Sequence, residues 1–274
     1  MELLQAILLG VVQGVTEFLP ISSSGHLVLF QSIFGIEEPE IFFDIAVHVG
    51  TLVAVCVFFF RDLKGIGVTL FSRSSWSKGD VSLLQRFSQK PEMRLLGLIF
   101  VGSVPTFLIG LVFRPMAETF FSSVRVVGIM LLVTGLLLWL TRGLRAGGRN
   151  TAELTLWDGL CVGAMQGLAI MPGLSRSGST IAIGLFKGLD RETAARYSFL
   201  LSIPAIVGAM VLELARTRAS LLPPLGPVLL GACVAGVVGY AALRVLIGLV
   251  KKGDLYRFSF YCWPVGGAAI VWSL

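Results

Sequence analysis

A sixteen-residue segment occurs once in each half of this chain. The first copy spans residues 10–25 (GVVQGVTEFLPISSSG) and the second spans residues 163–178 (GAMQGLAIMPGLSRSG). Six of the sixteen positions are identical without a gap. Each copy is an apolar, helix-like run that breaks at a proline and continues into a serine-rich turn. A repeated, interrupted hydrophobic segment with a polar tip typically marks a binding site inside a membrane protein built from inverted repeats.

The composition indicates a protein that is embedded in a bilayer. The chain is 55% hydrophobic and 14% charged, whereas soluble domains contain about 25% charged residues. Apolar runs of about the length that crosses a bilayer occur near residues 41–60, 95–113, 123–141, 196–214, 225–250 and 257–273. We therefore expect an all-α, polytopic integral membrane protein.

The distribution of basic residues predicts a topology, because Lys and Arg tend to stay on the cytoplasmic side. Most of the 22 basic residues fall in four connections, at residues 61–94, 142–154, 187–196 and 250–257. The net charge of +6 therefore lies in membrane loops and does not indicate a nucleic-acid partner. All four connections are cytoplasmic only if the two segments that contain the repeated motif each enter and leave the membrane on one side.

These two segments, residues 3–35 and 155–187, cannot cross the membrane as single helices. Pro20 and Pro172 interrupt them at their middles, and an interrupted backbone at membrane depth must be surrounded by protein or by a wet cavity. We interpret each segment as a re-entrant helical hairpin.

Three spanning helices follow each hairpin, and this odd number gives the two repeats opposite orientations. We expect one membrane domain over residues 1–274, with repeat 1 at about 1–141 and repeat 2 at about 155–274. The first hairpin then dips in from the outside and the second from the inside, and their tips meet near the midplane.

The first tip carries an amide and a carboxylate on one helix face. Gly10, Gln13, Gly14 and Glu17 have the spacing i, i+3, i+4, i+7, which places them in one stripe. The two glycines let another helix approach closely. The stripe therefore combines close packing with two polar side chains near the break.

The residues after each break resemble the start of a helix. Serines suit N-cap positions, and the free N–H groups of a helix start attract anions. In the first copy these residues are Ser22, Ser23, Ser24, Gly25 and His26, where His26 is expected on the same face as Ser23. In the second copy they are Ser175, Ser177 and Ser179, together with Arg176, whose planar fork suits phosphate. A Glu, a His and a Ser beside such donors favour hydrolysis over passive binding.

Plainer interpretations of the same residues stay open. Glu17 and Arg176 could form only a structural pair across the repeat interface, and the serines could act only as caps. Asp44 and His48, spaced i, i+4, could face the cavity or make an ordinary helix-face hydrogen bond. Asp158 lies near a helix end and is expected to be solvated.

At these residues the chain resembles the undecaprenyl-diphosphate phosphatases, also called bacitracin-resistance proteins, over essentially its whole length. Two motifs carry the resemblance: (E/Q)GxxE followed by PxSS(S/T)GH at residues 13–26, and PGxSRSxxT at residues 172–180. The resemblance implies an enzyme that removes the terminal phosphate of undecaprenyl diphosphate, an isoprenoid diphosphate lipid. The product is the lipid carrier of cell-wall precursors. It also implies a multi-pass protein of the bacterial plasma (inner) membrane whose active site opens to the outer face.

The resemblance assigns roles to residues at both tips. The catalytic positions correspond to Glu17, Ser23, His26 and Arg176. The phosphate-binding positions correspond to Ser22, Ser24, Gly25, Ser175, Ser177, Ser179 and Thr180. A divalent cation, Mg²⁺ or Ca²⁺, is implied near Glu17 and Gln13, although glutamine, which stands at a position that is often Glu, is a weaker ligand. The attacking group stays open: Ser23 attacks or positions the attack, with His26 or Glu17 as the base.

The alternative from a different functional class is a transporter or flippase of a phosphorylated isoprenoid lipid. Inverted repeats with broken helices also describe secondary transporters, and Glu17 could then couple proton movement. Membrane lipids surround the protein in either case, and the sequence leaves open whether the chain forms a homodimer.

Overall fold

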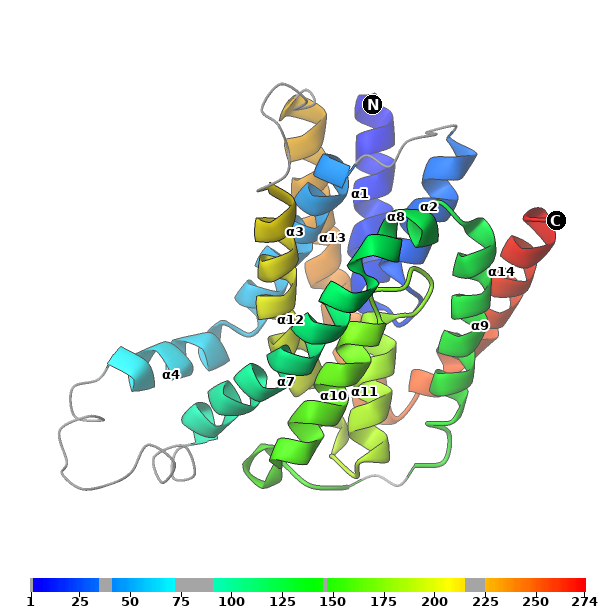
Figure 1. The fold of residues 1–274 in the computed structure, drawn as a ribbon. Helices are drawn as coiled ribbons and strands as arrows, with labels where there is room; N and C mark the ends of the chain where they lie inside the picture. The colour runs from blue at the N-terminus through cyan, green and yellow to red at the C-terminus, as the bar shows by residue number, and fades with distance from the viewer. Residues whose placement is uncertain (1, 35–40, 72–90, 145–146, 215–224) are drawn as a thin grey trace, which may run out of the picture.

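The computed structural model describes residues 2–34, 41–71, 91–144, 147–214 and 225–274, and these residues are mostly helical (Figure 1). The helices are α1 (Leu3–Phe18), α2 (Ser23–Ile33), α3 (Ile41–Phe58), α4 (Phe60–Phe71), α7 (Pro91–Phe113), α8 (Ala117–Phe121), α9 (Val124–Trp139), α10 (Leu156–Leu168), α11 (Arg176–Phe186), α12 (Arg191–Leu214), α13 (Leu225–Lys252) and α14 (Ser259–Trp272). The described part contains no β-strand beyond an isolated bridge between Arg149 and Leu189.

Each of the six apolar runs predicted to cross the membrane is a helix in the structure, namely α3, α7, α9, α12, α13 and α14. Three stretches are long and apolar enough to span a bilayer alone: Pro91–Met116, Arg191–Leu212 and Leu225–Lys252. A fourth span arises if α3 and α4, which bend by 75° at their junction, cross together. The all-α, multi-pass membrane architecture predicted from the sequence is confirmed.

The two broken segments form helical hairpins whose tips touch in the middle of the molecule. Helices α1 and α2 lie in the upper half of Figure 1, and α10 and α11 lie in the lower half. Ser22 Oγ accepts a hydrogen bond from the Gly173 amide at 3.0 Å, and Ser177 Oγ donates to the Phe18 carbonyl at 3.0 Å. The predicted division into two inverted repeats, at about 1–141 and 155–274, stays a prediction.

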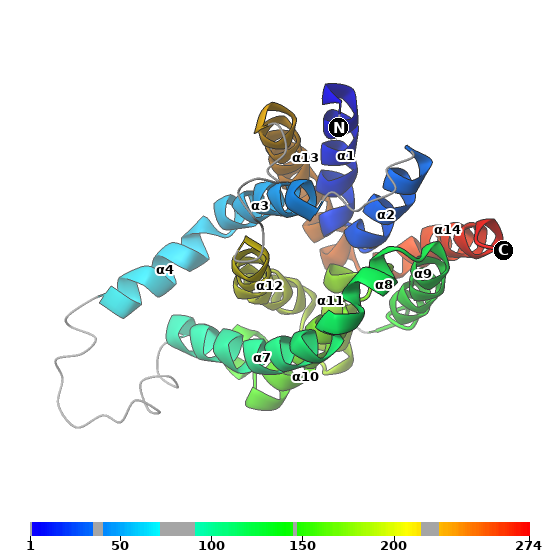
Figure 2. The same cartoon turned by 45° about the horizontal axis from the view of Figure 1, so that its top comes forward.

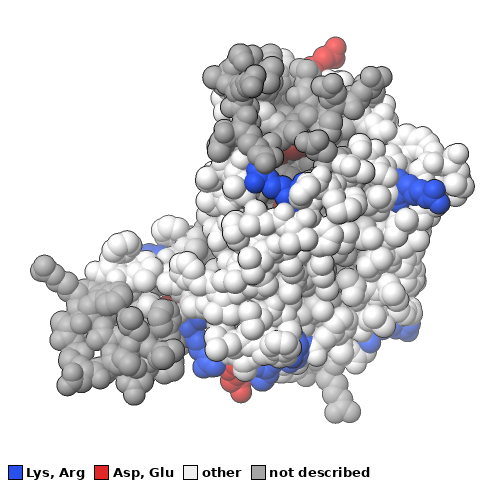
Figure 3. Space-filling model, viewed as in Figure 1, with Lys and Arg blue, Asp and Glu red and all other residues white. Residues whose placement is uncertain are grey.

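Basic residues are unevenly distributed on the face that Figure 3 shows. Most Lys and Arg gather along its lower edge, two further basic patches lie in its upper half, and both chain ends lie toward the top in Figure 1. The predicted membrane sidedness stays a prediction. Parts of the predicted loops at 61–94 and 142–154, namely residues 72–90 and 145–146, lie outside the described residues. Figure 2, turned by 45°, shows α11 and α12 toward the middle, with α1 beside α13 and α10 beside α7.

Close helix contacts hold the first hairpin against α13, and glycines make them possible. A Cβ atom on Gly10 would lie 2.7 Å from the Gly231 carbonyl oxygen, and one on Gly14 would lie 2.8 Å from the Ala235 carbonyl oxygen. Only glycine permits backbones to approach this closely. The Gly10–Gly14 stripe therefore packs against α13, as its spacing predicts. This packing fixes the position of Glu17 along the α1 axis.

Gly163 provides the sharpest test of this packing, because a Cβ there would lie 2.0 Å from the Gly102 carbonyl oxygen on α7. Alanine at 163 must push α10 away from α7, and we expect a loss of about 3 kcal/mol from overpacking. Thermal unfolding of the purified protein in detergent measures this loss. Gly110→Ala is the control, since its Cβ meets nothing within 4 Å. Equal melting temperatures for the two variants would contradict the packing argument.

The expectation that Asp158 is solvated is wrong. Its side chain is 1% exposed, and it accepts hydrogen bonds from Arg149 Nη1 at 2.6 Å and from Thr155 Oγ1 at 2.8 Å. It forms a capping box with Thr155 at the start of α10, where a carboxylate meets free N–H groups. Arg149 also donates to the Lys187 carbonyl oxygen at 2.7 Å. Arg149 therefore links the start of α10 to the end of α11, at the end of the second hairpin that lies away from its tip.

Candidate active site

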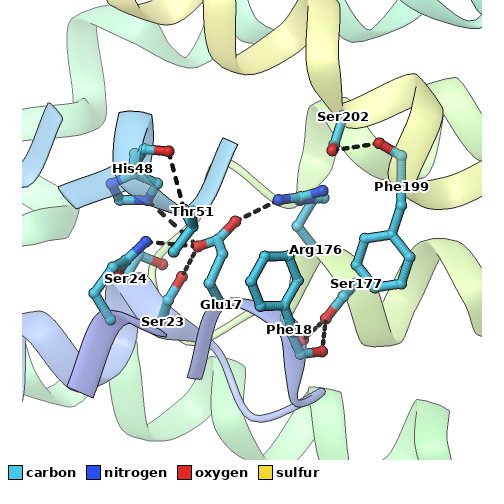
Figure 4. Close-up of polar contacts among 12 residues, drawn as sticks. Glu17, Phe18, Ser23, Ser24, His48, Thr51, Arg176, Ser177, Phe199 and Ser202 are labelled. Carbon is cyan, nitrogen blue, oxygen red and sulfur yellow. Dashed lines mark hydrogen bonds and ion pairs between the residues drawn. The ribbon is translucent and has the colours of Figure 1, made fainter. Parts of the chain in front are cut away.

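The hairpin tips place a buried carboxylate against a serine, an amide and a guanidinium (Figure 4). Glu17, in the last turn of α1, is 7% exposed. Its Oε1 forms an ion pair with Arg176, the first residue of α11. Its Oε2 accepts hydrogen bonds from Ser23 Oγ at 2.6 Å and from Gln13 Nε2 at 2.9 Å. We call Gln13, Glu17, Ser23 and Arg176 the Glu17 cluster.

Both returning helices start at this cluster, so their free N–H groups and positive dipole ends point toward the tips. Ser22 caps α2 by accepting a hydrogen bond from the Gly25 amide at 3.3 Å, and Ser175 caps α11 by accepting one from the Gly178 amide at 3.1 Å. The N-cap interpretation of the serine runs is therefore confirmed at these two positions. Two helix starts and one guanidinium favour an anion beside Glu17.

The predicted phosphate-binding residues of the first tip differ in accessibility. Ser23 and Ser24 are partly exposed, whereas Ser22 and Gly25 are buried. Ser24 Oγ lies 3.4 Å from Ser22 Oγ. A Cβ on Gly25 would lie 3.0 Å from the Gly173 backbone. Glycine at position 25 therefore allows the two hairpin tips to approach each other closely. Ser23 and Ser24 are thus the hydroxyls of this tip that a ligand can reach.

The predicted phosphate-binding hydroxyls of the second tip are buried and engaged within the protein. Ser179 Oγ donates to the Arg176 carbonyl oxygen at 3.3 Å, and Thr180 Oγ1 donates to the same oxygen at 2.6 Å. Ser175 Oγ and Ser177 Oγ lie 3.3 Å apart. These contacts shape the turn that presents Arg176, and direct binding of phosphate by these hydroxyls stays a prediction.

His26 does not join the Glu17 cluster. Its Nδ1 lies 2.8 Å from the Ser22 carbonyl oxygen and its Nε2 lies 2.9 Å from the Tyr261 hydroxyl. Within the described parts of the chain, no hydrogen bond or ion pair joins His26 to Glu17, Ser23 or Arg176. A catalytic role for His26 stays a prediction from the resemblance.

The histidine that faces Glu17 is His48 on α3, for which the sequence left open whether it faces the cavity or bonds its own helix (Figure 4). Its Nε2 lies 3.5 Å from Glu17 Oε2, and its side chain is 30% exposed. Its Nδ1 lies 2.7 Å from the Asp44 carbonyl oxygen. The i, i+4 spacing of Asp44 and His48 is the sequence pattern that pointed to this residue. Both interpretations of that spacing hold, because His48 bonds its own helix and also lies beside Glu17.

The donor atoms of the Glu17 cluster allow a test of the implied divalent cation. No group of three or more His, Cys, Asp or Glu side chains that could hold a metal occurs among the residues that the structure describes. However, Gln13 Oε1 is a buried acceptor without a hydrogen-bond partner beside the Glu17 carboxylate. Mg²⁺ and Ca²⁺ prefer such oxygens. One carboxylate and one amide oxygen are too few to hold such a cation alone, so a cation at this cluster stays a prediction.

Fold and site together define a multi-pass membrane protein with a buried polar cluster between the tips of two helical hairpins. The chain belongs to the family described as bacitracin resistance protein BacA, which matches residues 6–268. It is 49% identical over 272 residues to the undecaprenyl-diphosphatase of Desulfatibacillum aliphaticivorans, covering 99% of each chain. It is also 49% identical to the undecaprenyl-diphosphatase of Desulforapulum autotrophicum, over 99% of this chain and 98% of that one. The undecaprenyl-diphosphatase of Halothermothrix orenii is 42% identical, with 99% and 98% covered. The family predicted from the two motifs is confirmed.

Proposed function

We propose that this chain is an undecaprenyl-diphosphatase, which hydrolyses the terminal phosphate of undecaprenyl diphosphate and yields undecaprenyl phosphate. The enzyme acts in the bacterial plasma membrane, and its site opens to the outer face. This proposal is supported by the names of the three relatives and by one feature of the site. Arg176 Nη1 is buried without a hydrogen-bond partner, beside the hydrogen bond that Ser23 donates to Glu17. A terminal phosphate placed there gains a guanidinium donor next to an activated hydroxyl.

The proposed reaction uses the contacts of the Glu17 cluster directly. Ser23 Oγ attacks the terminal phosphorus while its proton moves to Glu17 Oε2, the atom 2.6 Å away. A bond forms between Ser23 Oγ and phosphorus, and the bond to the bridging oxygen breaks, which releases undecaprenyl phosphate. After Glu17 loses this proton to solvent, it accepts a proton from an attacking water and returns it to Ser23 Oγ as inorganic phosphate departs.

Charge stabilisation provides most of the catalysis in phosphoryl transfer. Arg176 contacts Glu17 through Nη2 and keeps Nη1 for the transferring phosphoryl group. The starts of α2 and α11 add N–H groups on the same side. Gln13 Oε1 and Glu17 would hold the divalent cation that the family implies, and that cation would neutralise further charge on the diphosphate.

Phosphate release separates this enzyme from the flippase alternative. Purified protein in detergent, given undecaprenyl diphosphate and Mg²⁺ or Ca²⁺, is expected to release inorganic phosphate. A flippase releases none, because it moves lipid without breaking a bond. The three relatives named above are all diphosphatases by name, and a flippase gives no reason for a serine hydroxyl bonded to Glu17. Absence of release under both cation conditions would overturn the proposal.

A further inference from the structure

We propose that His26 and Tyr261 form a positioning pair, which holds the backbone of Ser22 so that the next residue, Ser23, faces Glu17. Proton transfer in the reaction then does not pass through His26. This inference rests on the proposed function for its kinetic consequences, whereas the pair itself is a structural feature. Tyr261 lies on α14, at the other end of the chain from α2.

Both ring nitrogens of His26 are engaged by partners that fix the tautomer. The Ser22 carbonyl oxygen, 2.8 Å from Nδ1, can only accept a hydrogen bond, so Nδ1 carries the hydrogen. In a neutral ring Nε2 then has only its lone pair, and it accepts from the Tyr261 hydroxyl at 2.9 Å. The two rings are stacked with centroids 5.7 Å apart, and His26 is 3% exposed. Neither nitrogen is left for the substrate.

The residue that His26 holds has an unusual backbone. Ser22 has a φ of 72°, and within the described residues it is the only non-glycine residue with a positive φ. This left-handed conformation is unfavourable for a residue with a Cβ and persists only where surrounding contacts impose it. Those contacts include the bonds from His26 Nδ1 and from the His26 backbone N–H to the Ser22 carbonyl oxygen, and the bond from the Gly173 amide to Ser22 Oγ.

The conformation of Ser22 determines where Ser23 points. Ser23 is the first residue of α2, and its Oγ lies 2.6 Å from Glu17 Oε2. A relaxed Ser22 would rotate the peptide that joins the two serines and move this hydroxyl. The chain of contacts therefore runs from α14 through Tyr261, His26 and Ser22 to the attacking hydroxyl.

Two substitutions at His26 separate positioning from proton transfer. In His26→Asn the side-chain nitrogen takes the place of Nδ1 and still donates to Ser22, but an amide cannot act as a base. In His26→Gln the side-chain nitrogen takes the place of Nε2, so the side-chain bond to Ser22 is lost and only the backbone N–H of residue 26 still donates to the Ser22 carbonyl oxygen. We expect kcat to fall by about fivefold in His26→Asn and by about 100-fold in His26→Gln, with little change in KM. A catalytic base contributes about 10²- to 10⁴-fold, so equal losses of that size in both variants would overturn the proposal.

Tyr261→Phe tests the second half of the pair, because it keeps the stacked ring and removes the hydroxyl. We expect kcat to fall about fivefold in the wild-type background and to stay unchanged in the His26→Asn background, since Asn offers no acceptor at the Nε2 position. Tyr256→Phe is the matched control and should leave kcat unchanged. An equal loss in both backgrounds would show that Tyr261 acts without His26.

A spectroscopic measurement tests the pair independently of activity. The chain contains two histidines, so ¹⁵N-histidine labelling gives two imidazoles, and His48→Gln assigns them. We expect the His26 ring to be neutral with hydrogen on Nδ1, and its Nε2 resonance to shift in Tyr261→Phe. A hydrogen on Nε2, or no shift in this variant, would refute the pair even in a preparation without phosphatase activity.

Discussion

Replacing Arg176 with alanine is expected to lower kcat for phosphate release by about 10³-fold, because preorganised donors to a transferring phosphoryl group contribute on this scale. Arg176 pairs with Glu17 through Nη2, and its Nη1 is buried without a partner. Release of inorganic phosphate by purified protein in detergent measures the effect. Near-normal turnover in Arg176→Ala would refute the assignment.

Arg176→Ala is also expected to lower stability, so a second variant is needed to separate the catalytic effect from the loss of stability. Without Arg176, the Glu17 carboxylate is buried and unpaired, and breaking a buried pair costs about 3–5 kcal/mol. Arg176→Lys keeps the charge opposite Glu17 but lacks the planar fork that can hold Glu17 and phosphate together. We expect it to unfold near the wild-type temperature while kcat falls at least about tenfold. Arg125→Ala, an exposed residue of α9, controls for the loss of a positive charge and should leave kcat unchanged.

The hairpin tips could be predicted from the sequence because their signals are local. A proline fixes where each helix ends, the serines cap the next helix, and the stripe from Gly10 to Glu17 has helical spacing. The structure ends α1 at Phe18 and begins α2 at Ser23, on either side of Pro20. The meeting of the two tips followed from the topology that the basic residues imply.

Helix α4 was not predicted, because residues 61–94 were interpreted as a loop. Its sequence, Phe60–Phe71, contains Arg61, Asp62 and Lys64, and these charges hide it from a search for apolar spans. Asp62 forms an ion pair with Arg196 on α12, which anchors the start of α4 after its sharp bend from α3. Such a pairing depends on tertiary structure and leaves no local signal.

His26 and His48 show that sequence spacing also cannot predict which side chains meet within the site. Spacing along α2 puts His26 near Ser23, but the Ser23 hydroxyl turns toward α1 while the His26 ring turns toward α14. His48 faces Glu17 only because α3 packs beside α1 with a particular rotation about its own axis. Sequence spacing fixes the face of one helix and cannot fix which neighbour that face meets. The choice between His26 and Glu17 as the base stays a prediction, and the hydrogen bond from Ser23 Oγ to Glu17 favours Glu17.

Ser23→Ala is the second substitution with a large expected effect, and kcat should fall by about 10³-fold or more when the nucleophile and its proton transfer are removed. The change deletes one oxygen, and the Glu17 cluster keeps the bonds from Arg176 and Gln13 to Glu17. Stability should therefore change little, in contrast to Arg176→Ala. Ser32→Ala, at an exposed position on the same helix, is the matched control.

The Ser23 variant also distinguishes a covalent route from direct attack by water. If Ser23 is the nucleophile, acid quenching of wild-type protein during turnover should trap phosphate on the peptide that contains residue 23, and the alanine variant should trap none. If Ser23 only orients a water molecule toward Glu17, no labelled peptide appears and alanine retains turnover within about tenfold, since water can occupy the space of the lost hydroxyl. The 2.6 Å hydrogen bond from Ser23 Oγ to Glu17 Oε2 favours the covalent route, because the hydroxyl already donates to the base before substrate binds.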